Sequence, residues 1–247
     1  MPTTDDLADE LAIAVGGADI FAVYQPQVSL ESGSIVAAEA LCRWRHPRLG
    51  DIDPSTMIGV AERSGVIHAL GRRMLDECLD ALAGWRETGR EWAVAVNVSP
   101  LQFEDESFAL HVAAEFEQRA FPAGSLVLEL TQDVEPVDER VLPQLHMLRE
   151  IGVEISLAGY GDDSSSLEGL RSVPLTEVKL PGDLVRAAAG PALAPLRDRV
   201  EIAHAHGLRV VAEGIETLTH LDIAVQLGCD RAQGFLIRHP DPEIVFP

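Results

Sequence analysis

The chain of 247 residues is poor in aromatic residues and in cysteines. Aromatic side chains make up 5% of the sequence and hydrophobic residues 47%, so aliphatic side chains must fill the core. The three cysteines lack C-x-x-C spacing, and an odd count argues against a disulfide framework. We therefore expect reduced thiols and a cytoplasmic location.

Basic residues are also scarce, since 19 lysines and arginines face 40 acidic residues and the formal net charge is -21. A uniformly acidic surface repels phosphate backbones, which argues against nucleic acid as a partner. Solubility alone is an alternative reason for this charge. No apolar run reaches the length of a membrane span, and the N-terminus has no basic region that would open a signal peptide. We expect a free-standing protein that does not enter a membrane.

Two kinds of apolar pattern alternate along the chain. Apolar residues three or four apart predict helices at Ile67–Trp85, Phe108–Phe116, Val141–Leu148 and Arg197–Ala205. A capping box at Ser165–Glu168 predicts the start of a further short helix.

Between the helices lie short runs rich in Val, Ile and Leu, as expected for parallel strands covered on both faces. Eight such runs occur, at Phe21–Val28, Ser34–Leu41, Ala93–Val98, Ser125–Leu130, Val153–Leu157, Leu175–Leu180, Leu208–Gly214 and Arg231–Ile237. This alternation predicts an α/β fold, a closed (β/α)8 barrel. A doubly wound open sheet is the alternative, but no Gly-rich phosphate loop follows the first strand.

Most of these runs end near a polar residue that is suited to chemistry. The set comprises Glu39, Asn97, Glu129, Lys179, Glu213 and Gln233. In a barrel the strand ends converge on one face, where such oxygen ligands suit a hard cation such as Mg²⁺. Arg43 is suited to gripping a phosphate with two nitrogens, which indicates a phosphodiester ligand. Any single Glu at a strand end is more often an ordinary surface residue, so the ordered set carries the argument.

The polar residues belong to a longer series of short motifs. They are Tyr24-Gln25-Pro26, Ala38-Glu39-Ala40-Leu41, Arg43-Trp44-Arg45-His46-Pro47, Asn97-Val98-Ser99-Pro100, Glu129-Leu130-Thr131, Lys179, Val211–Thr217, Gly228-Cys229-Asp230 and Gln233-Gly234-Phe235. In these motifs and their order the chain resembles the EAL domain family, whose members bind and hydrolyse cyclic di-GMP. The resemblance covers the chain from Ile20 to about Pro240.

The resemblance implies a TIM-type barrel whose first strand is antiparallel to the others. It implies a single EAL domain at residues 20–247, which a helical extension at residues 1–19 precedes. By analogy, it also implies a homodimer.

The resemblance further implies roles for individual residues. Glu39, Asn97 and Glu129 resemble ligands of Mg²⁺ or Mn²⁺, and Lys179 and Glu213 resemble catalytic residues. The positions that resemble contacts to the dinucleotide are Gln25, Leu41, Arg43, Gln233 and Phe235. Stacking of the Phe235 ring on a guanine is worth about 1–3 kcal/mol, although an ordinary core aromatic is the alternative for this residue.

The run Val153–Leu157 departs from the family, because Ala158-Gly159 follows where the family has two adjacent aspartates. Those aspartates complete a two-metal site in the family, and each Lewis-acid contact is worth several kcal/mol. Their loss is expected to slow hydrolysis by roughly three or more decades. Without a metal, the remaining carboxylates should repel one another and raise the pKa of at least one.

Two further departures lie near this loop, since Gln132 replaces a usual Glu and Pro181 stands where the family has Asp. Asp162 and Asp163 lie four residues after the gap, and four extended residues span about 13 Å, so a rearranged loop would bring them to the site. Capping of the following helix, or exposure to solvent, is the alternative for both.

Three functions follow as hypotheses. The first is a catalytically degenerate EAL domain that binds cyclic di-GMP as a receptor and signals to an unidentified protein partner. The second is a metal-dependent cyclic di-GMP phosphodiesterase of low activity. The third is a protein–protein interaction module that no longer binds the nucleotide.

Overall fold

A computed structural model describes residues 4–130, 140–161, 172–188 and 193–244 of the chain. Within these ranges a nine-stranded sheet has the order β1-β9-β8-β7-β6-β5-β4-β2-β3, and a further pairing of β1 with β2 closes it into a barrel. The strands are β1 (Ile20–Ser29), β2 (Ile35–His46), β3 (Gly50–Ile52), β4 (Ala93–Val98), β5 (Leu126–Leu130), β6 (Glu154–Leu157), β7 (Glu177–Leu180), β8 (Arg209–Ala212) and β9 (Arg231–Gln233).

Strand β1 is antiparallel to both of its neighbours, β2 and β9. The remaining pairs around the ring, from β2–β4 to β8–β9, are parallel. The prediction of a (β/α)8 barrel with an antiparallel first strand is therefore confirmed. Strand β3 was not predicted and forms a hairpin with the end of β2. Strand β9 ends at Gln233, before the predicted Ile237, because the backbone turns and the Ile237 and Arg238 N–H groups donate to the carbonyl of Gly234.

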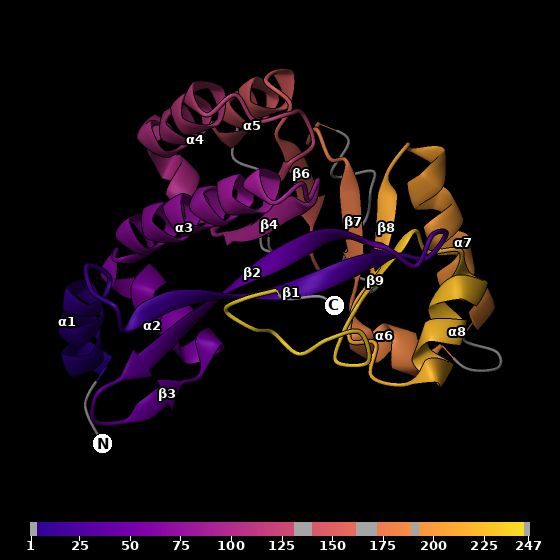
Figure 1. Cartoon of the computed structure of the whole chain (residues 1–247), viewed down its shortest axis with the longest axis horizontal. Helices are drawn as coiled ribbons and strands as arrows, with labels where there is room; N and C mark the ends of the chain where they lie inside the picture. The colour runs from indigo at the N-terminus through magenta and orange to yellow at the C-terminus, as the bar shows by residue number, and fades with distance from the viewer. Residues whose placement is uncertain (1–3, 131–139, 162–171, 189–192, 245–247) are drawn as a thin grey trace.

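The predicted helices at 67–85, 108–116, 141–148 and 197–205 are confirmed with small shifts of their ends. The helices are α1 (Thr4–Ala14), α2 (Pro54–Ser64), α3 (Ile67–Glu87), α4 (Glu106–Gln118), α5 (Val141–Glu150), α6 (Gly182–Ala187), α7 (Leu193–Ala205) and α8 (Leu218–Leu227), with a 3₁₀ turn at Pro100–Glu104. Figure 1 shows α3, α4 and α5 along one side of the barrel and α7 and α8 on the other. The helix start predicted at Ser165 lies outside the described residues.

The N-terminal helix lies beside α2 (Figure 1). Leu11 of α1 is fully buried in a small apolar cluster with Trp44, Met57 and Leu70. This cluster is separate from the main core, which the barrel strands form with α3, α4, α5, α7 and α8. Among the residues that the structure describes, no helix is both long enough and apolar enough to cross a bilayer.

Candidate functional site

Alternation along the strands brings the predicted site residues to one end of the barrel interior. Asn97 on β4 pairs in register with Glu129 on β5, which in turn pairs with Ser156 on β6. Because residues directly opposite one another in a sheet share a face, these side chains point the same way. Lys179 lies near the end of β7, and Glu213 directly follows β8. The carboxyl ends of parallel strands meet at one mouth of a barrel, so these groups converge there.

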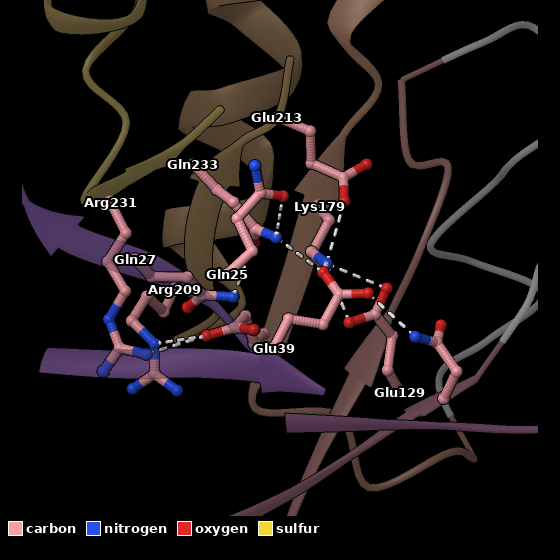
Figure 2. Close-up of polar contacts among 11 residues, drawn as sticks. Gln25, Gln27, Glu39, Glu129, Lys179, Arg209, Glu213, Arg231 and Gln233 are labelled. Atoms are coloured by element: carbon pink, nitrogen blue, oxygen red, sulfur yellow. Dashed lines mark hydrogen bonds and ion pairs between the residues drawn. The ribbon is translucent and has the colours of Figure 1, made fainter. Parts of the chain in front are cut away.

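Lys179 lies at the centre of this site and is fully buried. Its Nζ atom lies 2.7 Å from Oε2 of Glu39 and 2.8 Å from Oε2 of Glu129. The same nitrogen lies 2.8 Å from Oε1 of Glu213. Figure 2 shows the three carboxylates pointing toward the ammonium group from three directions. An ammonium group has three N–H donors, so each of them can be directed to one carboxylate.

Glu39 also accepts hydrogen bonds from two amide side chains. Asn97 Nδ2 donates to its Oε1 at 2.8 Å, and Gln233 Nε2 donates to its Oε2 at 2.8 Å. The Gln233 amide continues into a row on β1, since its Nε2 also donates to Gln25 Oε1 and its Oε1 accepts from Gln27 Nε2, both at 3.0 Å (Figure 2). Three predicted site residues therefore share one hydrogen-bonded network with Glu39.

Burial and charge act against each other in this cluster. Burial raises the pKa of Glu129 well above its ordinary value, and the Glu39 carboxylate raises it further. Burial also disfavours ionised Glu39, but the Lys179 ammonium and the amide hydrogen bonds outweigh it and lower the pKa of Glu39. Burial alone would lower the pKa of Lys179, yet the surrounding carboxylates hold that pKa well above its ordinary value. One ammonium is therefore shared by three acids, and the expected rise in at least one carboxyl pKa occurs at Glu129.

The carboxylates also fit a hard divalent cation. One oxygen from each of Glu39, Glu129 and Glu213 lies within 4.8 Å of the others. Carboxylate oxygens are ligands that Mg²⁺ and Mn²⁺ favour, and Asn97 adds an amide at the same mouth. When bound, such a cation would polarise a phosphoryl oxygen and lower the pKa of a bound water.

The backbone after β6 supplies no further carboxylate within the described residues. The Ala158 N–H donates to the carbonyl of Leu130 at 2.9 Å, so the ladder with β5 continues to this position. Ala158 is two residues beyond Ser156, and by alternation it lies on the face of the sheet that carries Glu129. Gly159 has a φ of 77°, a left-handed conformation that favours glycine. Gln132, Asp162 and Asp163 lie outside the described residues.

Two of the predicted ligand contacts, Leu41 and Arg43, lie beside the mouth. A pocket of about 430 Å³ opens beside Asn97, with Leu41, Arg43 and the apolar Met57 in its lining. The Arg43 guanidinium donates to the carbonyl of Cys42 at 2.9 Å and, within the described ranges, forms no ion pair. A cation in this position remains available to an anionic ligand.

Phe235 has 52% of its surface exposed, so the alternative of a core aromatic is wrong. Its ring stacks on His239, with centroids 4.3 Å apart. Its exposed surface leaves Phe235 accessible from solvent.

A second charged group in the barrel interior was missed by the sequence analysis. Glu177 is 1% exposed and lies 2.7 Å from Nε of Arg209 and 3.4 Å from a nitrogen of Arg231. These residues begin β7, β8 and β9, opposite the end that carries Glu213, and Figure 2 shows both arginines apart from Lys179. Gln27 was also missed, although its spacing of two from Gln25 places both on one face. The charges at this end pair with one another, which indicates a structural role.

Comparisons with known proteins agree with this geometry. A family model described as the EAL domain matches residues 8–240. MucR of Pseudomonas aeruginosa, a bifunctional diguanylate cyclase/cyclic di-GMP phosphodiesterase, is 33% identical over 223 residues, which cover 89% of this chain and 33% of MucR. Cyclic di-GMP phosphodiesterase PA2567 of the same species is 32% identical over 238 residues, covering 95% of this chain and 40% of the relative. The chain thus spans two fifths or less of the length of these relatives.

Solved structures include the PaMucR phosphodiesterase in a c-di-GMP complex, with a TM-score of 0.87 and 31% identity. The similarity covers 96% of this chain and 97% of that one. The FimX EAL domain of Pseudomonas aeruginosa bound to c-di-GMP has a TM-score of 0.88, and the similarity covers 98% of this chain and 99% of that one. Its identity is 17%, so this second similarity concerns the fold alone.

Proposed function

The chain belongs to the EAL domain family, and on that premise we propose that it is a receptor that binds cyclic di-GMP and hydrolyses it very slowly or not at all. Relatives at about a third identity include a cyclic di-GMP phosphodiesterase, and a structure at 31% identity holds c-di-GMP. Recognition of the same ligand is supported by Arg43 in the pocket beside Asn97, by the Gln233 amide bonded to Glu39 and by the exposed Phe235.

The observation that carries the receptor function is that the carboxylates of Glu39, Glu129 and Glu213 are all paired with the ammonium of Lys179. Hydrolysis by two metals needs carboxylates that bridge both ions. Ala158 and Gly159 offer none where the family has two. A ligand that is held by Arg43, by the glutamine amides and by stacking needs no metal for its binding.

A second candidate is a metal-dependent phosphodiesterase of low activity. It is favoured by the carboxylates of Glu39, Glu129 and Glu213, which converge closely enough for one cation. With one cation in place of two, the attacking and leaving oxygens are not stabilised together, so turnover falls by roughly three or more decades. This candidate predicts linear dinucleotide in Mn²⁺ that disappears in Glu39→Ala.

Calorimetric titration with cyclic di-GMP in EDTA tests the receptor function. We expect binding by the wild-type chain, and a loss of tenfold or more in Arg43→Ala, because the variant lacks a charged phosphate contact worth roughly 1.5–3 kcal/mol. Arg45→Ala is the matched control, since Arg45 lies on the same strand with its side chain 70% exposed. Absence of heat from the wild-type chain at high micromolar ligand would contradict the proposal. Partner capture that Arg43→Ala leaves intact would then favour the interaction module.

A further inference from the structure

Lys179 is the only lysine in the chain, and the other basic residues among the 19 are arginines. This lysine is fully buried, and its nitrogen contacts three carboxylates at 2.7–2.8 Å. A guanidinium is planar and spreads its donors in a fork, whereas an ammonium is a compact charge with three tetrahedrally directed donors. The position therefore requires a compact cation at the meeting point of three acids.

A divalent cation would be bound by the same three carboxylates. The Oε2 atom of Glu39, Oε2 of Glu129 and Oε1 of Glu213 each lie within 2.8 Å of Lys179 Nζ. Glu129 offers both of its oxygens to the ammonium, at 2.9 and 2.8 Å. A metal on these carboxylates would therefore compete with the ion pairs that the buried ammonium already makes.

The charges of the cluster lead to the same conclusion. When all three carboxyl groups are ionised, they and one ammonium leave two negative charges, which one divalent cation would balance. Without the ammonium, three negative charges would lie together in a buried site, where like charges repel strongly. The ammonium thus both stabilises the three carboxylates and lowers their attraction for a metal.

We propose that Lys179 is a built-in counter-cation that keeps the carboxylate cluster assembled without metal and competes with divalent cations for it. This role of Lys179 rests on the proposed receptor function only because both concern the same mouth of the barrel. It concerns how the cluster responds to metal, so its test uses metal alone and no nucleotide. If the chain does not bind cyclic di-GMP, the role of Lys179 toward metal is unaffected. If Lys179 does not compete with metal, the proposed binding of cyclic di-GMP is unaffected.

The sole lysine makes the test direct. Protein labelled with ¹⁵N-lysine gives one side-chain ammonium signal, which reports Lys179 without assignment by mutation. We expect this signal to be slowly exchanging in EDTA, and to shift or broaden as Mg²⁺ saturates the site. A signal that is unchanged at saturating Mg²⁺ would contradict the competition.

Lys179→Met provides the second measurement, by calorimetric titration with Mn²⁺ alone. We expect affinity about tenfold tighter or more than in the wild-type chain, because a positive competitor within hydrogen-bonding distance is gone. Lys179→Arg, which keeps the charge, should retain weak binding. Equal or weaker affinity in the Met variant would overturn the proposal.

Folding of Lys179→Met is followed by near-ultraviolet circular dichroism. If the variant unfolds in EDTA and refolds when Mn²⁺ is added, the metal has replaced the ammonium and the proposal is supported. If it remains unfolded in Mn²⁺, a metal cannot take the place of the ammonium, and the proposal is wrong.

Discussion

On the proposed receptor function, replacing Ala158 with aspartate should raise the rate at which the chain hydrolyses cyclic di-GMP. The backbone at this position already continues the ladder from β6 toward β5, beside Glu129. A carboxylate there adds a ligand for a second cation, and one Lewis-acid contact worth about 3 kcal/mol corresponds to about a hundredfold in rate. The added charge should also lower the melting temperature in EDTA and make it rise in Mn²⁺, because it enlarges the repulsion that a metal relieves.

Restoring the second aspartate at Gly159 should lower the stability of the protein. At a φ of 77°, an aspartate there costs roughly 1–2 kcal/mol of backbone strain, near the lower end because Asp tolerates this region. The double variant Ala158→Asp with Gly159→Asp should therefore melt about 2–4 °C below the single variant.

The assay is chromatography of cyclic di-GMP after incubation in Mn²⁺, combined with thermal unfolding. Ala158→Asn is the matched control, because it keeps the shape of aspartate without its charge and should remain inactive. If neither the single nor the double variant forms linear dinucleotide faster than the wild-type chain, the reasoning from the missing carboxylates is refuted.

Three further predictions concern other residues. Phe235→Ala should weaken cyclic di-GMP binding about 5- to 150-fold in calorimetry without lowering the melting temperature, because the ring is 52% exposed; unchanged affinity would exclude stacking. Gly234→Ala places a Cβ atom 2.2 Å from backbone atoms of Ile215. The free energy of unfolding in urea should therefore fall by about 3 kcal/mol, and a fall below about 1 kcal/mol would contradict this contact. His46→Ala removes a buried ring whose Nδ1 accepts hydrogen bonds from two backbone N–H groups and whose Nε2 contacts Glu10. The free energy of unfolding should therefore fall by about 2–3 kcal/mol in the same assay. An unchanged free energy of unfolding would show that water replaces the ring.

Much of the fold could be predicted because its elements have distinct periods. Short runs such as Ala93–Val98 and long amphipathic stretches such as Ile67–Trp85 alternate, and this pattern is typical of a barrel. Helix α2 was missed although Asp53 and Pro54 are an N-cap and N1 signal, and the Asp53 side chain does accept from the N–H of Thr56. Hairpin β3 was missed although it is local, with His46 paired to Gly50, because its strand has only three residues and no apolar run. The docking of α1 on α2 could not be predicted, because it depends on contacts between segments far apart in the sequence.

The site was predicted as a set of residues but not as a set of contacts. Strand ends indicated that Glu39, Glu129 and Lys179 share a mouth. Sequence spacing carries no information on which group lies at the centre, and the central position of the ammonium follows from the closure of the barrel. Glu177 was missed because its charge is paired inside the barrel by arginines from β8 and β9, and such pairing is not visible along one strand.

We propose that the mouth holds a cyclic dinucleotide and leaves it intact. The most direct measurement is to incubate the wild-type chain with one equivalent of cyclic di-GMP in Mn²⁺, to isolate the protein by gel filtration, and to chromatograph the nucleotide that it carries. We expect intact cyclic di-GMP in the protein peak after many hours. Linear dinucleotide in place of the cyclic compound, or a protein peak that carries no nucleotide, would contradict it.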